Sequence, residues 1–66
     1  MASIAETLKS VVNYTDPYHA RRVAEDCLKH HQVPFSYLRD EYNNVWGILF
    51  ETSILDLETH EISDIH

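Results

Sequence analysis

Two side chains that could do chemistry together lie four residues apart near the middle of the chain. On a helix, this spacing brings the Cys27 thiol and the His31 imidazole to one side. A zinc site would need further ligands, for which the chain offers His60 and His66 near its end but no Cys-x-x-Cys pair. Cys27 also falls within an apolar helical stripe, as a small core residue would. We therefore predict no metal site and no cofactor, with metal binding kept as a less favoured alternative.

Catalytic arrangements are equally sparse. Catalysis by Cys27 with His31 as the base would need an open cleft and an oxyanion site, which the buried face of a helix does not offer. Asp40 and Glu41 are adjacent carboxylates, but neighbours on a strand point to opposite faces and cannot share a proton. The one glycine, Gly47, lies in an apolar run, so there is no glycine-rich phosphate loop. We predict that the protein is not an enzyme.

The distribution of charge is the main functional signal. The formal net charge is −6. Residues 1–39 hold all five basic residues and four acids, whereas residues 40–66 hold seven acids and no lysine or arginine. An acidic field of this kind repels nucleic-acid phosphates and favours a basic protein surface as the partner. The alternative is that the acidic residues of 40–66 serve only solubility.

Length and composition predict one small domain, residues 1–66. The chain is 44% hydrophobic and 24% charged, which is typical of a globular protein. Its longest apolar run, 45–50, is far shorter than the ~20 residues that cross a bilayer, and no secretory leader opens it. The single cysteine suits a reducing compartment. We expect a complete small reading frame in the cytoplasm, in the host cytoplasm if a bacteriophage encodes it, with no membrane partner.

The first helix is predicted to run from a capping box to Asn13. Ser3 and Glu6 have the spacing at which each side chain can bond the other residue's backbone N–H. Apolar residues then recur at helical spacing, which predicts a helix face that packs on the rest of the domain. These residues are Ile4, Leu8, Val11 and Val12.

The second helix has clearer boundaries. Asp16 is its N-cap and Pro17 its first residue, and it ends at Val33-Pro34 because the residue before proline avoids helical angles. On the outer face we expect ion pairs four residues apart, Arg22–Asp26 and Glu25–Lys29. With Arg21, these form a solvated face rather than a nucleic-acid site. The apolar stripe consists of Ala20, Val23, Ala24, Cys27, Leu28 and His31.

From Phe35 the apolar period changes to two, which predicts a β-hairpin over residues 35–52 with Asn43-Asn44 as a two-residue turn. This register places Leu38 opposite Leu49, Gly47 opposite Asp40 and Trp46 opposite Glu41. Gly47 should mark a bulge or a close approach, such as an aromatic ring lying across it. One face, with Phe35, Tyr37, Trp46, Ile48 and Phe50, should cover the helices. The lighter face carries Leu38, Tyr42, Val45 and Leu49.

Residues 53–66 fit two patterns. They can form a strand, a turn and a ragged strand, or a short amphipathic helix opened by Ser53 and Asp56. We favour a third strand because the hairpin gains stability from another member. The predicted fold is α+β, with two N-terminal helices packed on one face of a small antiparallel sheet.

These features predict a small acidic protein-binding module that blocks or modulates a basic, nucleic-acid-binding partner protein, without binding nucleic acid directly. Small acidic proteins without catalytic groups are typical of accessory or inhibitory proteins, including those of bacteriophages. The alternative is a structural homodimer or a small subunit of a larger complex, since a 66-residue core has a thin stability margin. The predicted partner-binding residues are Asp40, Tyr42, Leu49, Glu51, Asp56, Glu58 and Glu61.

Overall fold

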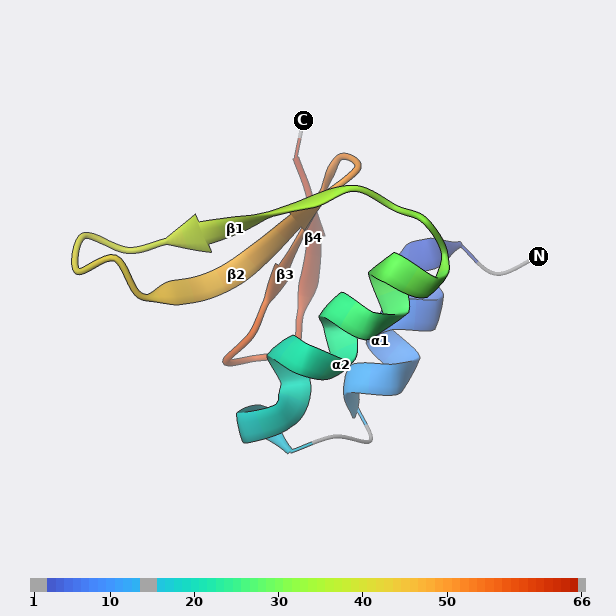
Figure 1. The fold of residues 1–66 in the computed structure, drawn as a ribbon, viewed down its shortest axis with the longest axis horizontal. Helices are drawn as coiled ribbons and strands as arrows, with labels where there is room; N and C mark the ends of the chain where they lie inside the picture. Colours follow the sequence, from blue (N-terminus) through green and yellow to red (C-terminus); the bar gives the residue numbers. More distant parts are fainter. Residues whose placement is uncertain (1–2, 14–15, 66) are drawn as a thin grey trace.

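A computed structural model describes residues 3–13 and 16–65 of the chain. These residues form two helices followed by a four-stranded antiparallel sheet of order β1-β2-β3-β4. Both helices lie on the same side of the sheet (Figure 1). The predicted α+β fold is confirmed. The elements are α1 Ile4–Asn13, α2 Pro17–His30, β1 Phe35–Arg39, β2 Val45–Phe50, β3 Ser53–Asp56 and β4 Ile62–Asp64.

Both helices begin at the predicted caps. The Ser3 Oγ accepts the backbone N–H of Glu6 at 3.2 Å, and a carboxylate oxygen of Asp16 accepts that of His19 at 3.1 Å. The His19 ring also lies 2.9 Å from the Asp16 carboxylate. This side-chain hydrogen bond lowers the pKa of Asp16. The capping side chains take up backbone donors that the first turn of a helix leaves without partners.

The sequence predicted that the second helix ends at Val33. Helix α2 ends three residues earlier, at His30. Gln32 adopts a left-handed conformation with φ 59°. The N–H of Gln32 bonds the Lys29 carbonyl at 3.1 Å, and that of Val33 bonds the Leu28 carbonyl at 2.9 Å. This Schellman arrangement satisfies the last carbonyls of the helix and turns the chain towards β1.

The β1–β2 hairpin has a different register from the predicted one. Leu38 lies opposite Gly47 rather than Leu49, a shift of two residues along β2. Asp40 is the cause, because its Oδ1 accepts the backbone N–H groups of Tyr42 and Asn44, each at 2.9 Å. Residues 40–44 therefore close the loop, instead of a two-residue Asn43-Asn44 turn. Because the shift is an even number of residues, it leaves the predicted faces of the strands unchanged.

A β-bulge between Leu38 and Arg39 is an exception to that rule, because it brings Val45 opposite Arg39. Val45 packs against the core cluster, so its prediction on the lighter face is wrong. Trp46, predicted for the covered face, leaves 36% of its surface exposed. Glu41 lies in the loop and not opposite Trp46, so that predicted pairing is also wrong.

The end of the chain is the predicted strand, turn and ragged strand, not a helix. Strand β3 pairs with β2, and β4 pairs with β3 through three residue pairs, Ser53–Asp64, Ile54–Ser63 and Leu55–Ile62. The Ser53 hydroxyl also donates to the Asp64 carboxylate at 3.0 Å. This hydrogen bond joins the two strands near the end of the described chain.

The core lies between the helices and the covered face of the sheet. Leu8, Val12, Leu28, Ile48 and Phe50 are all buried there, as predicted. Two residues of the predicted stripe on α2, Val23 and Cys27, are only partly buried. His31, the last residue of the predicted stripe, is exposed because it caps the end of α2. The other members of the buried cluster are Ala24, Leu55 and Leu57.

Candidate functional site

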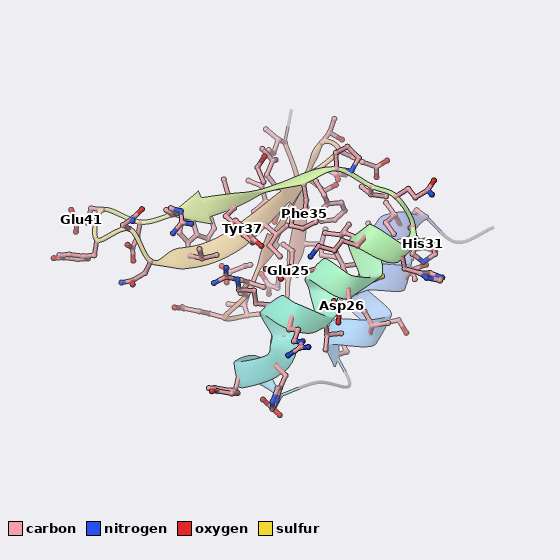
Figure 2. The ribbon with its side chains drawn as sticks, viewed as in Figure 1. Glu25, Asp26, His31, Phe35, Tyr37 and Glu41 are labelled. Carbon is pink, nitrogen blue, oxygen red and sulfur yellow. The ribbon has the colours of Figure 1, made fainter. Side chains whose placement is uncertain are left out.

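Most of the predicted binding acids lie in two loops at one end of the sheet. In an antiparallel sheet, the β1–β2 loop (residues 40–44) and the β3–β4 loop (residues 57–61) leave the same end. Figure 1 shows the β1–β2 hairpin extending well beyond the helices. Glu41 lies at the tip of this hairpin (Figure 2). We call the two loops, together with Asp40 and Asp56 at their bases, the acidic end.

Glu51 does not belong to the acidic end. It lies in the β2–β3 turn at the other end of the sheet, with φ 51°. The structure therefore separates one predicted carboxylate from Asp40, Asp56, Glu58 and Glu61. The sequence prediction grouped these acids by their positions along the chain. In the folded sheet, each reversal between strands places the next turn at the opposite end.

Asp40 and Asp56 both hold loops together. The Asp40 carboxylate closes the β1–β2 loop, as described above. The Asp56 Oδ1 accepts the backbone N–H groups of Glu58 at 2.8 Å and Thr59 at 3.2 Å. Asp56 therefore has a structural role in the β3–β4 loop, besides carrying charge. Glu58 and Glu61 are both exposed.

The lighter face of the sheet is the second part of the candidate site. Leu38, Leu49 and Ile54 lie on neighbouring strands and are partly exposed. No helix within the described ranges packs on this side, since both helices contribute to the core on the other. We call these three residues the open face.

Gly47 lies beneath the open face and allows its side chains to pack closely. A Cβ atom at this position would lie 3.0 Å from the Leu55 carbonyl oxygen and 3.5 Å from the Leu38 Cδ1. It would also lie 3.7 Å from the Ile54 Cγ2. The close approach expected at Gly47 is confirmed, but the backbone carbonyl of Leu55 makes it instead of an aromatic ring.

Tyr42, the predicted aromatic anchor, lies in the β1–β2 loop with 78% of its surface exposed. It is thus in the acidic end, next to Glu41, and outside the open face. Leu49, the predicted apolar anchor, does lie in the open face. The two predicted anchors therefore belong to different parts of the surface.

The sequence missed a polar contact between α2 and β1. The Tyr37 hydroxyl donates to the Glu25 Oε1 at 2.5 Å, and the Arg21 Nε donates to the same oxygen at 3.0 Å. The Arg21 guanidinium also lies 4.6 Å from the centre of the Tyr37 ring. Glu25 is therefore hydrogen-bonded to Arg21, where the sequence predicted a pair with Lys29. In Figure 2, Glu25 and Tyr37 point towards one another from their two elements.

Burial alone would raise the pKa of Glu25, but the hydrogen bonds from Tyr37 and Arg21 outweigh it and lower the pKa. The same bond to Glu25, and then the contact with Tyr37, raise the pKa of the Arg21 guanidinium. Both shifts favour the charged forms, so Glu25 and Arg21 form an ion pair near neutral pH. The hydrogen bond from Tyr37 to Glu25 fastens α2 to the edge strand of the sheet.

Cys27 is partly buried on α2, whereas His31 is exposed at the end of this helix. Burial raises the pKa of the Cys27 thiol, which disfavours the nucleophilic thiolate. Across residues 3–13 and 16–65, no three histidine, cysteine or acidic side chains gather to hold a metal ion. His66, considered above as a zinc ligand, lies outside the described residues.

The chain matches no protein-family model, and neither the curated proteins nor the solved structures include a significant match to it. Within the described residues, neither helix is long and apolar enough to cross a membrane. The arguments about function therefore start from the acidic end and the open face themselves.

Proposed function

We propose that this protein is a small acidic binding module that blocks or modulates a basic protein, one whose cationic surface normally meets nucleic acid. The observation that carries the proposal is the position of the acidic end beside an apolar sheet face that no described helix covers. Carboxylates at a rim steer a cationic partner, and apolar side chains at the centre hold it.

The two parts of the surface have different tasks. Glu58 and Glu61, with Glu41 at the hairpin tip, attract the partner and raise the association rate. Leu49, Leu38 and Ile54 lose water on contact and slow dissociation. Asp40 and Asp56 contribute charge while they keep the loops in shape.

Differential capture tests this proposal. The protein is immobilised and exposed to a host lysate, beside the variants Leu49→Gln and Glu58→Gln/Glu61→Gln. We expect a basic protein to be retained by the parent and reduced on each variant, because one removes apolar contact and the other removes charge. Retention should also fall as salt is added.

Two matched controls make the comparison specific. The pair Glu6→Gln/Asp26→Asn removes the same amount of charge from the helices, and Tyr18→Ser removes an aromatic side chain that is 89% exposed on α2. Both controls should retain the partner as the parent does. Equal loss on control and test variants would indicate a non-specific charge effect, and retention of nucleic acid alone would refute the proposal.

A further inference from the structure

Strand β1 is an edge of the sheet, and its outward backbone groups can be assigned from the hydrogen bonds of the inner strands. The Leu57 N–H bonds the Trp46 carbonyl at 3.0 Å, so these two residues form a hydrogen-bonded pair of the antiparallel ladder. Because such pairs alternate, Gly47 and Leu49 direct their backbone groups towards β1. Their partners are Leu38 and Ser36.

The remaining β1 residues direct their backbone groups away from the sheet. These are Phe35, Tyr37 and Arg39, which alternate with the inward pair. The Asp40 N–H bonds the Asn44 carbonyl at 3.0 Å, which places Arg39 between two inward-facing residues and fixes its outward direction. An edge of this kind is a template on which another strand can pair.

The two edges of the sheet differ in how they are protected. Strand β4 has only three residues, ends at Asp64 and follows Glu61. Shortness and charge are common defences of an edge strand. Strand β1 has five residues, mostly exposed, and contains no acid and no proline. It is therefore the edge open to pairing.

We infer that β1 is a self-association edge, at which the β1 strand of a second copy pairs antiparallel about a two-fold axis at Tyr37. In this register Tyr37 lies opposite Tyr37 of the second copy, and Phe35 lies opposite Arg39 of the second copy. This register pairs the outward N–H and carbonyl groups of Phe35, Tyr37 and Arg39. A two-fold axis at a neighbouring residue of β1 would leave some of these backbone groups unpaired. This inference goes beyond the proposed function and does not depend on it.

Charge complementarity explains why a second copy is the occupant. Residues 27–39 contain no acid, so the β1 edge lies in the stretch of chain where two copies of net charge −6 repel each other least. The antiparallel register also carries Asp40 and Glu41 of one copy past β1 of the other, towards the end of α2 that bears Lys29. Opposite charges then meet on both sides of the axis.

The side chains of β1 fit this pairing. On the open face, Leu38 of one copy lies beside Ser36 of the other, so the two apolar open faces become one continuous surface. On the covered face, Arg39 lies opposite an aromatic ring, a favourable arrangement for a guanidinium. No like charges face each other directly across the new strand pair. The dimer would present two acidic ends and one extended apolar face.

Sedimentation and amide exchange of the intact protein test the inference. The protein is measured from tens of micromolar to millimolar concentration, and backbone exchange is followed residue by residue. We expect a dimer mass at high concentration, with exchange at Tyr37 and Arg39 slowed by about tenfold, because only the monomer exposes these amides. The Ser36 and Leu38 amides are bonded to β2, so they should be protected from exchange at both the lowest and the highest protein concentration.

A backbone variant supplies the matched comparison. The chain is short enough for chemical synthesis with ligation at Cys27, and an N-methyl group at Tyr37 removes one outward N–H while keeping the side chain. This variant should stay monomeric with an unchanged far-ultraviolet spectrum. A parent monomeric at millimolar concentration would overturn the inference, as would a dimer whose Tyr37 and Arg39 amides exchange as fast as in the monomer. Neither result would bear on the proposed function, which the capture experiment tests independently.

Discussion

The Tyr37 hydroxyl donates to the Glu25 carboxylate across 2.5 Å, and this bond joins the edge strand to the second helix. Few other described polar contacts link side chains so far apart in the sequence. Glu25 also accepts from Arg21, whose guanidinium lies against the Tyr37 ring. The carboxylate is well shielded, with a side chain 17% exposed, so these hydrogen bonds contribute to stability.

Tyr37→Phe should therefore reduce the free energy of unfolding by about 1 kcal/mol at neutral pH, the usual value of one such hydrogen bond. Urea unfolding followed by tryptophan fluorescence measures this change. Tyr42→Phe makes the same chemical change at a residue that is 78% exposed, and it should leave stability unaltered. Equal effects in the two variants would contradict the role assigned to Tyr37.

The pH dependence follows from the same contact. The pKa of Glu25 is lower in the folded protein than in the unfolded chain, so its ionised form stabilises the fold above the unfolded pKa. That stabilisation is lost as the pH falls below the ordinary glutamate pKa and through the lower folded pKa. In this range the parent should lose more unfolding free energy than Tyr37→Phe does. Parallel pH profiles would show that the bond does not hold the pKa down.

Gln32→Gly should stabilise the protein. Gln32 has φ 59°, a left-handed conformation that costs a non-glycine residue about 1 kcal/mol. Thermal unfolding should show a corresponding gain. Ser10→Gly, within α1, is the control and should lose stability by roughly 0.5–1 kcal/mol, since glycine is unfavourable in a helix. A loss at both positions would argue against the Schellman ending of α2.

Gly47→Ala should destabilise the sheet by about 1–3 kcal/mol, the usual cost of overpacking. The added methyl group would lie 3.0 Å from the Leu55 carbonyl oxygen, a backbone atom that cannot rotate away. Ser36→Ala changes a residue of the neighbouring strand β1 and adds no such contact. This control should therefore leave the free energy of unfolding nearly unchanged. Denaturant unfolding of both variants checks the difference, and a neutral Gly47→Ala would show that β3 can move aside.

Asp56→Ala should cost about 1–2 kcal/mol because it leaves two loop N–H groups without their acceptor. Glu58→Gln/Glu61→Gln should change stability by no more than about 0.5 kcal/mol, as is usual for exposed side chains. Chemical unfolding of the two variants separates a carboxylate that shapes the loop from those left for a partner. Similar stabilities for both would remove that distinction.

Much of the fold was predictable because local signals agreed with one another. The caps at Ser3 and Asp16, the helical stripes and the alternation in residues 35–52 each specify an element without knowledge of the rest. The two-residue shift in the hairpin was not predictable from turn residues, because the Asp40 side chain competes for the loop amides. The bulge that turns Val45 inward likewise depends on packing across strands.

The candidate site was predictable in composition but only partly in position. The excess of acids after residue 39 is visible in the sequence, and most of them do gather at one end of the sheet. Glu51 does not, because it occupies the opposite turn. Glu25 lies on a helix and Tyr37 lies on a strand, twelve positions further along the chain. No local sequence pattern therefore predicts the hydrogen bond between them.

The central claim is that exposed carboxylates of the acidic end steer a basic partner, and the association rate tests it most directly. The basic protein retained in the capture experiment is purified, and its binding to the parent and to Glu58→Gln/Glu61→Gln is timed at low salt and near 1 M salt. We predict slower association of the variant at low salt and equal rates at high salt, where the Debye length is about 3 Å. If the variant associates as fast as the parent at low salt, the acidic end does not steer binding and the account is wrong.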